Sequence, residues 1–361
     1  MRVAWIHLDI KNRIQEFDEG IYPMSHLWGY PLKKQNRKNI LNPLFKNCII
    51  IRFCSIIDKI TRNRLGNSWV EISLIYKRKQ FDAVYCVSGH LFWIPILKKL
   101  GILEKRIIIL LYKLPKHTPW WKFHDLHHSI FILKCYDGIN CLTNKLKNDL
   151  YSAGYKGLAK NLSWGTDLQL FKPRKYKVNC KYFFSNGKTN RDYKTLLEAI
   201  KKLPNISFKA IAHWEHHKQI PQNLEAIKTN TKITDKAITY AELTRYYEES
   251  IAVCIPLIED PEDTCGYTEC LEALAMGKPV LMTRTGCLDI DIEKEGVGIY
   301  INPNDSHDWV RKLKMLNKNR KLSEKMGAKG KEFVRNYYNI KAYNIRVHAF
   351  ISEVLSKASS N

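Results

Sequence analysis

A glycine turn followed by a short helix carries the residues with the clearest chemical potential in this sequence. Gly266 precedes an expected helix that starts at Tyr267 and Thr268, and Glu272 lies one turn further along. A helix start offers backbone N–H groups and a partial positive charge, which suit a phosphate. The carboxylate of Glu272 can accept hydrogen bonds from the hydroxyls of a ribose. These residues predict a nucleoside diphosphate bound at the helix start.

A second glycine turn supplies the positive charge that a diphosphate requires. Gly187 is followed by Lys188 and Arg191, ahead of an expected helix at Asp192–Lys202. Glycine lets a ligand approach the backbone closely, and a guanidinium group can bind a phosphate through two parallel hydrogen bonds. We predict that Lys188 and Arg191 stabilise the diphosphate as it leaves. The alternative for Arg191 is a surface ion pair with Asp192.

Three segments of the C-terminal half together resemble glycosyltransferases of the GT-B fold, especially family 4. The segment 272–280 (EALAMGKPV) resembles the family's donor-site signature, 163–173 its interdomain connector, and 186–199 its diphosphate-binding loop and following helix. The resemblance implies transfer of a sugar from a nucleoside-diphosphate sugar to a hydroxyl acceptor, either a glycan or a lipid-linked molecule. It also implies that the configuration at the anomeric carbon is retained.

The chain departs from the family pattern at one position. The family signature contains two glutamates separated by seven residues; Glu272 matches the second, and Thr264 occupies the place of the first. The resemblance implies that the loop containing Thr264 contacts the donor sugar. Asp263 could supply the missing carboxylate through a shift of one residue. Glu269 is interpreted as a first-turn charge that is favourable to the helix dipole.

The remaining candidates concern the first half of the chain and metal ions. His90 follows an expected strand and a Ser88-Gly89 turn, and parallel sheets bind ligands at the carboxyl ends of their strands. We therefore predict that His90 contacts the donor sugar or an acceptor phosphate, with a surface histidine as the alternative. Asp289-Ile-Asp291 resembles a metal motif of the other major glycosyltransferase fold but follows a turn. The ten cysteines lack zinc spacing, so no metal or other cofactor is expected.

Alternating strands and helices predict an α/β protein with parallel sheets. In the first half, expected strands include Asn47–Phe53, Phe81–Val87 and Arg106–Tyr112. We expect an acceptor-side Rossmann-like domain at 1–165 and a donor-binding Rossmann-like domain at 166–340. A helix within 341–361 is expected to cross back to the first domain. The resemblance implies the GT-B arrangement, in which the two sheets face each other across a cleft.

The charge is large and uneven. The chain has a formal net charge of +24, and residues 1–165 carry 27 Lys and Arg against 11 Asp and Glu, a net +16. A basic first domain attracts anionic partners, among them a membrane surface, a lipid-linked phosphate or nucleic acid. Nucleic acid is not expected, because no binding motif for it is visible. We expect a cytoplasmic protein with peripheral contact to an anionic membrane; a solvated basic surface is the alternative.

Other functions compatible with the same residues remain open. The chain could isomerise or hydrolyse nucleotide sugars on a GT-B fold. It could be a catalytically idle nucleotide-sugar-binding protein, which Thr264 makes conceivable. The net charge also leaves a nucleic-acid-binding protein as a weaker alternative.

Overall fold

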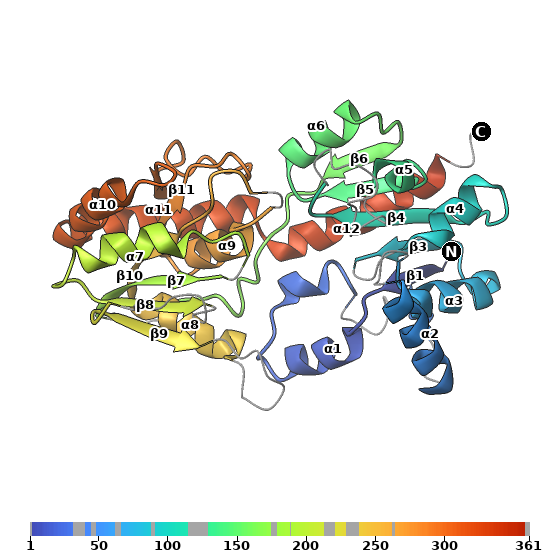
Figure 1. The fold of residues 1–361 in the computed structure, drawn as a ribbon, viewed down its shortest axis with the longest axis horizontal. Coiled ribbons are helices and arrows are strands. Elements are labelled where there is room, and N and C mark those ends of the chain that lie inside the picture. Colours follow the sequence, from blue (N-terminus) through green and yellow to red (C-terminus); the bar gives the residue numbers. More distant parts are fainter. Residues whose placement is uncertain are drawn as a thin grey trace. The chain divides into compact units, whose positions relative to one another are not determined.

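The computed structural model describes residues 2–31, 40–44, 48–61, 66–87, 91–114, 129–174, 179–187, 189–212, 221–228, 238–261 and 264–357. The chain divides into two compact units, each built on one six-stranded parallel sheet with helices around it (Figure 1). The first unit comprises Met1–Ile14, Leu27–Ser163 and Tyr343–Asn361, and the second comprises Gln15–His26 and Trp164–Ala342. The predicted α/β class with two Rossmann-like halves is confirmed.

The first unit is built on a sheet with the strand order β2-β1-β3-β4-β5-β6. Its strands are β1 (Val3–Ile6), β2 (Ile40–Leu41), β3 (Ala83–Cys86), β4 (Arg106–Leu111), β5 (Gly138–Cys141) and β6 (Leu158–Asn161). The helices are α2 (Cys48–Ile60), α3 (Ser68–Tyr76), α4 (Trp93–Lys99), α5 (Ile130–Leu133) and α6 (Asn144–Ser152). Helix α1 (Ile10–Asp18) starts in this unit and ends in the second one.

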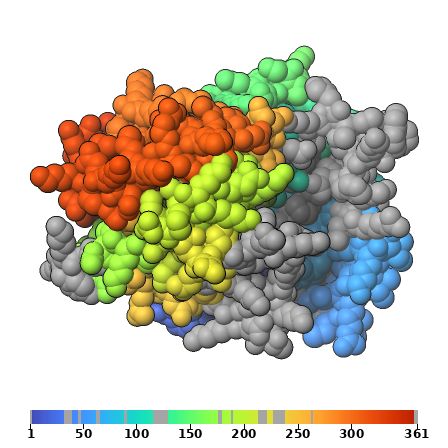
Figure 2. Space-filling view, turned by 60° about the vertical axis from the view of Figure 1, so that its left-hand side comes forward, coloured from blue at the N-terminus to red at the C-terminus, as the bar shows by residue number. Residues whose placement is uncertain are grey.

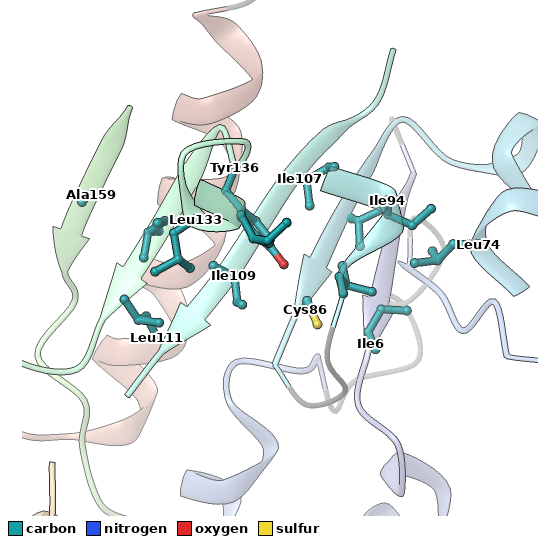
Figure 3. Packing of buried hydrophobic residues seen from close by; sticks show 14 of the residues in the cluster. Ile6, Leu74, Cys86, Ile94, Ile107, Ile109, Leu111, Leu133, Tyr136 and Ala159 are labelled. Carbon is teal, nitrogen blue, oxygen red and sulfur yellow. The ribbon is translucent and has the colours of Figure 1, made fainter. Parts of the chain in front are cut away.

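The core of the first unit forms where helices cover the sheet. Figure 3 shows Leu74 of α3 and Ile94 of α4 beside the strand residues Ile6, Cys86 and Ile107, all of them buried. Strands that are buried on both faces require continuous apolar runs, and β3 and β4 consist largely of such residues. This explains why both strands could be predicted from the sequence.

The strand predicted at Asn47–Phe53 is wrong, because residues 48–60 form the helix α2. A run of isoleucines suits a buried strand or a helix face equally well, so its composition misled the prediction. In the helix, Cys54 is buried and Ile50 and Ile57 are half-buried, a spacing of three and four residues. The residues of α2 that face the protein thus recur with the spacing of a helix.

The second unit has the strand order β12-β11-β10-β7-β8-β9. Its strands are β7 (Tyr182–Asn186), β8 (Phe208–Ala212), β9 (Leu224–Lys228), β10 (Ser250–Ile255), β11 (Val280–Thr283) and β12 (Gly298–Ile301). The order along the chain runs outward from β7 in one direction and then from β10 in the other. This is the nucleotide-binding Rossmann order, in which ligands bind at the point of reversal, beyond the carboxyl ends of the two central strands.

In the described ranges of the second unit, five helices accompany the sheet. They are α7 (Tyr193–Lys201), α8 (Tyr240–Glu249), α9 (Tyr267–Ala275), α10 (Ser306–Lys318) and α11 (Arg320–Tyr337). In the space-filling view, the orange-red α10 lies beside the yellow-green α7 on the surface of this unit (Figure 2). Helix α11 packs against α9 through small residues: a Cβ added at Gly330 would lie 2.6 Å from Leu274 Cδ2, and one at Gly327 would collide with the carbonyl of Gly277.

One chain segment belongs to a different unit from the one that its place in the sequence predicted. Residues 15–26 lie in the second unit, where Met24 N–H donates to Asp167 Oδ2 (2.8 Å) and Trp164 Nε1 donates to the carbonyl of Ser25 (3.1 Å). Nothing in the composition of residues 15–26 separates them from their neighbours. The sequence-based boundary at 165 therefore leaves this segment in the first domain.

The last helix, α12 (Ile340–Ser356), contributes to the first unit from Tyr343 onward. Asn140 Nδ2 donates to the Tyr343 hydroxyl at 3.0 Å, and Arg346 Nε donates to the carbonyl of Leu162 at 2.7 Å. Gly138 of β5 lies so close to α12 that a Cβ there would be 2.6 Å from Val354. The C-terminal residues are thus part of the core of the first unit.

Candidate functional site

The carboxyl end of β7, the loop after it, the loop ahead of α9, the start of α8 and the first two turns of α9 line a cavity of about 270 Å³ in the second unit. This is the reversal point of the strand order, where Rossmann-type sheets bind their ligands. The residues that line the cavity are Asn186, Gly187, Thr189, Arg191, Tyr240, Thr264, Cys265, Gly266, Thr268, Glu269 and Glu272. Polar and charged side chains therefore converge from both glycine turns that the sequence singled out.

The turn after β7 requires glycine for two independent reasons. Gly187 has a φ of 137°, a conformation that side-chain-bearing residues rarely adopt. A Cβ at this position would also collide with the guanidinium group of Arg191. The turn thus allows Arg191 to fold back against the backbone at the end of β7.

Arg191 is held by groups within the second unit. Its Nη1 donates to the carbonyl of Thr189 at 2.8 Å, and its Nη2 forms an ion pair with Glu269 Oε2 at 2.9 Å. The side chain is only 6% exposed, and its Nε has no hydrogen-bond partner among the residues that the structure describes. Burial by itself lowers the pKa of Arg191, but the neighbouring Glu269 raises it, and the net shift is upward. Arg191 is therefore a fixed, fully charged cation beside the cavity.

Glu269 has a larger role than its expected contribution to the helix dipole. It is buried in the first turn of α9, where it pairs with Arg191 and accepts the N–H of Asn186 at 2.5 Å. The carboxylate therefore ties α9 to the end of β7 and positions the two turns relative to each other. Burial raises the pKa of Glu269, and the guanidinium of Arg191 opposes that shift. The sequence could not show this contact, because 77 residues separate the two partners.

Glu272 has one oxygen that is satisfied and one that is not. The Tyr247 hydroxyl donates to its Oε2 at 2.9 Å, whereas Oε1 is buried and has no hydrogen-bond partner among the described residues. Burial raises the pKa of Glu272 to about 8; the Tyr247 hydroxyl opposes this shift and the nearby Glu269 adds to it. A buried acceptor without a partner is costly for a folded protein and calls for an explanation. Glu272 lines the cavity, so a ligand hydroxyl would provide the missing donor.

The start of α9 forms one wall of the cavity. Gly266 is the N-cap residue in a left-handed conformation (φ 77°), and it provides no side-chain cap for the first N–H groups of the helix. Thr264 and Thr268 line the cavity with it. The side chain of Tyr267 does not: it is buried against Trp164 and Tyr338, with ring centroids 5.8 and 6.3 Å apart. Because the side chain is buried elsewhere, only the backbone N–H of Tyr267 could bind the predicted diphosphate.

Three of the predicted residues, His90, Lys188 and Asp263, lie outside the part of the chain that the structure describes.

One residue that lines the cavity was not predicted from the sequence. It is Tyr240, at the start of α8. Its position follows the Thr239 capping box, which marks the start of a helix. A capping signal locates the helix but does not indicate which ligand pocket its first residue borders.

The aspartates of the Asp289-Ile-Asp291 motif serve in part to stabilise a turn. Asp291 Oδ1 accepts the N–H groups of Glu293 and Lys294, both at 3.2 Å. Among the described residues, no group of three or more His, Cys, Asp or Glu side chains is arranged to hold a metal ion.

The cavity lies within a segment of the chain that matches a known protein family. Residues 171–333 match the family described as glycosyl transferases group 1. This segment contains every residue that lines the cavity. In sequence, the chain is 24% identical over 246 residues to the sulfoquinovosyl transferase SQD2 of Arabidopsis thaliana, across 62% of this chain and 46% of that protein. The match thus spans about half the length of this curated relative.

Solved structures share the fold over most of the chain. The structure of HepE from Anabaena in complex with UDP-glucose has a TM-score of 0.65 at 11% identity and covers 100% of both chains. A glycosyltransferase from Rickettsia africae has a TM-score of 0.62 at 14% identity and covers 98% of both chains. Sucrose-phosphate synthase from Thermosynechococcus elongatus has a TM-score of 0.63 at 13% identity and covers 83% of this chain and 80% of that one. The protein therefore has the GT-B fold of these glycosyltransferases.

Proposed function

We propose that this protein is a glycosyltransferase that moves a sugar from a nucleoside-diphosphate sugar to a hydroxyl acceptor, a glycan or a lipid-linked molecule. The observation that carries the proposal is the buried Oε1 of Glu272, which has no hydrogen-bond partner within the described part of the chain and belongs to a residue that lines a cavity of the second unit. A ribose hydroxyl supplies the hydrogen bond that this oxygen lacks. The match of residues 171–333 to glycosyl transferases group 1 supports the same function.

In this proposal the diphosphate lies at the start of α9, against the N–H groups that follow Gly266. The helix dipole and these N–H groups stabilise its negative charge. Arg191 adds a full positive charge at the same cavity, and its Nε–H is a buried donor without a partner among the described residues. Arg191 and Glu272, each with one buried polar atom that has no partner in the described ranges, thus line the same cavity. Lys188, which follows Gly187, is proposed to contribute a further positive charge.

The reaction exchanges one bond to the anomeric carbon for another. The bond between that carbon and the diphosphate oxygen breaks, and a bond to the acceptor oxygen forms. The acceptor hydroxyl transfers its proton to the departing diphosphate. Positive groups that stabilise the leaving diphosphate lower the barrier, because negative charge develops on that oxygen in the transition state. Retention of configuration and independence from metal ions are part of the proposal.

Thr264 is proposed to contact the donor sugar through its hydroxyl, because it lines the cavity next to the start of α9. His90 is proposed to contact the donor sugar or an acceptor phosphate. Hydrolysis or isomerisation of the donor is distinguished from transfer by analysing the products with and without an acceptor alcohol. A protein that binds the donor and yields no product under either condition would instead be a nucleotide-sugar-binding protein.

The test of donor binding is isothermal titration of a panel of nucleoside diphosphates and their sugars into the wild-type protein and the variant Glu272→Gln. The titrations are run above the pKa of Glu272, which is about 8, so that its carboxyl group is ionised. Glutamine preserves the size of the side chain and an oxygen for the Tyr247 hydroxyl, but it removes the charged acceptor. Loss of a hydrogen bond to a charged group is worth about 1.5–3 kcal/mol, which weakens binding about 10- to 100-fold.

The matched control is Glu332→Gln, which changes an exposed glutamate on α11 in the same way. It should bind the same donor as tightly as the wild-type protein does. Equal affinity in Glu272→Gln and the wild-type protein would remove Glu272 from the site, and no binding of any compound by the wild-type protein would contradict the proposed function.

A further inference from the structure

A stripe of large apolar side chains is exposed along α2 in the first unit. The exposed fractions are 78% for Ile49, 60% for Phe53, 56% for Ile56 and 77% for Ile60. These residues follow one another at intervals of three and four, so they share one face of the helix, opposite the buried Cys54. We call these four residues the α2 stripe. In Figure 1, α2 is the blue helix beside α3.

A second exposed apolar group lies in the same row of helices. In this row α2 packs beside α3, α3 beside α4 and α4 beside α5. Leu100 and Ile102, which follow α4, are 66% and 67% exposed, and Phe131 of α5 is 57% exposed. Lys99 Nζ lies 5.0 Å from the centre of the Phe131 ring, which brings these segments together. The row of helices therefore exposes apolar side chains near α4 and α5 as well as on α2.

Positive charge accompanies both groups. Arg52 and Lys59 are exposed on α2 and lie seven residues apart, along one flank of the stripe. The single acidic residue of α2 is Asp58, whose Oδ1 accepts the N–H of Ser68 at 3.0 Å on the side that faces α3. Lys99 is exposed next to Leu100. Apolar side chains flanked by arginine and lysine are typical of helices that lie in the interface of a bilayer.

We propose that the α2 stripe docks on a lipid bilayer that contains anionic lipids, with Ile49, Phe53, Ile56 and Ile60 inserted among the headgroups. Arg52 and Lys59 then lie at the level of the lipid phosphates. Charge complementarity favours this partner, since residues 1–165 carry a net charge of +16 and anionic leaflets attract clusters of basic residues.

A second copy of the chain fits the stripe less well. Two identical stripes would bring Arg52 and Lys59 of one copy close to those of the other, in a protein with a net charge of +24. Four side chains also fall well short of the roughly 800 Å² that each partner buries in a stable interface. Within the described part of the chain, every helix is too short or too polar to cross a bilayer. The contact is therefore with the membrane surface.

The proposal extends the proposed function in one respect and is otherwise independent of it. If the protein transfers sugars, docking through the first unit brings a lipid-linked acceptor to the domain expected to bind acceptors. Vesicle binding is measured without any sugar donor, and donor binding is measured without vesicles. A failure of one therefore does not entail a failure of the other.

The experiment is flotation of the full-length protein with vesicles of phosphatidylcholine alone and of phosphatidylcholine mixed with phosphatidylglycerol. The wild-type protein should float with the mixed vesicles, and added salt should weaken this binding because it screens surface charge. Phe53→Ser/Ile56→Ser and Arg52→Gln/Lys59→Gln should each reduce the partition coefficient at least tenfold. All the changed side chains are exposed, so the fold should persist, and circular dichroism checks this.

Two variants on the second unit serve as matched controls. Lys314→Gln/Lys318→Gln removes the same charge from exposed positions of α10, and Tyr337→Ser removes a side chain that is 63% exposed. Both should float like the wild-type protein. An equal loss in the α10 control would show that net charge, and not the α2 stripe, binds the vesicles.

Two other results would overturn the proposal. One is that neither kind of vesicle carries the wild-type protein. The other is a concentration-dependent dimer, seen by analytical ultracentrifugation, that Phe53→Ser/Ile56→Ser abolishes; the stripe would then be a contact between copies.

Discussion

At the scale of single residues, Glu272 should make both the stability of the protein and its affinity for the donor depend on pH. Burial raises the pKa of its carboxyl group from the ordinary 4.5 to about 8. The folded protein therefore binds a proton at Glu272 that the unfolded chain releases. The free energy of unfolding should accordingly decrease as the pH rises from about 4.5 to about 8, and Glu272→Gln should lack this contribution.

The same shift predicts how donor affinity depends on pH. A ribose hydroxyl donates its hydrogen bond to the carboxylate, so the deprotonated form binds better. Between pH 6 and the pKa of about 8, affinity for a nucleoside-diphosphate sugar should increase with pH, with a limiting slope of about tenfold per unit. Titration calorimetry across this range measures the slope. If Glu272→Gln showed the same slope as the wild-type protein, another group would be responsible.

Arg191 shows why an alanine substitution is a poor test of this site. Its guanidinium pairs with the buried Glu269, and removing one member of a buried pair destabilises a protein by about 3–5 kcal/mol. Arg191→Ala would therefore disturb the fold as well as any phosphate contact. The conservative change at Glu272 separates binding from stability more cleanly.

The individual site residues were predictable to the extent that their chemistry is local. Gly187, Gly266, Arg191 and Glu272 could be found because a glycine turn and the residues after it are neighbours in the sequence. Glu269 as the partner of Arg191 could not, because the contact joins two loops that the sheet brings together. The aromatic cluster that holds the side chain of Tyr267 could not be predicted either, because its other members, Trp164 and Tyr338, are distant from Tyr267 in the sequence.

At the scale of secondary-structure elements, the contact between α9 and α11 fixes the helix that borders the cavity. Replacing glycine with alanine inside a helix normally stabilises it by about 1 kcal/mol. At Gly327 the opposite sign is expected, because the new Cβ would collide with the backbone carbonyl of Gly277, which cannot rotate away. We predict that Gly327→Ala lowers the free energy of unfolding by about 1–3 kcal/mol, measured in urea.

Lys325→Ala is the matched control for this substitution. Lys325 is exposed on the same helix, so alanine there should change the stability by less than about 0.5 kcal/mol. A Gly327→Ala protein as stable as the wild type would mean that α11 can move away from α9 at little cost.

The elements themselves were predictable where a single periodicity dominates. The buried strands β3, β4 and β10 are short apolar runs, and α10 and α11 alternate apolar and polar positions with helical spacing. α2 was mistaken for a strand because isoleucine occupies both its inner and its outer face. Ile49, one of the isoleucines that misled the prediction, also belongs to the α2 stripe that is proposed to contact lipid.

At the scale of the whole molecule, the first unit depends on a helix from the other end of the chain. Phe350 of α12 is buried near Gly138, whereas Ile345 on the same helix is 71% exposed. Phe350→Ala should destabilise the first unit by about 3–5 kcal/mol, and Ile345→Ala should have little effect. Hydrogen exchange reports the two units separately: protection should fall in β3–β5 and persist in β7, β10 and β11.

Faster exchange in both sheets after Phe350→Ala would mean that the two units unfold as one.

The sequence predicted two Rossmann-like halves because strand and helix patterns repeat along the chain. It did not predict that residues 15–26 belong to the second unit. That assignment depends on the hydrogen bonds of Met24 and Ser25 with Asp167 and Trp164, and no local pattern encodes such pairing.

The division of the chain also has a consequence for how the protein is made. On the ribosome, all residues of the second unit have been synthesised once Ala342 has been added, whereas the first unit still lacks Tyr343 and everything after it. The hydrogen bond between Asn140 and Tyr343, and the packing of Gly138 against Val354, can form only after residues 343–354 have been synthesised. The first unit, whose strands are all synthesised before those of the second, is thus completed only after the second unit, because it also needs the residues of α12 from Tyr343 onward.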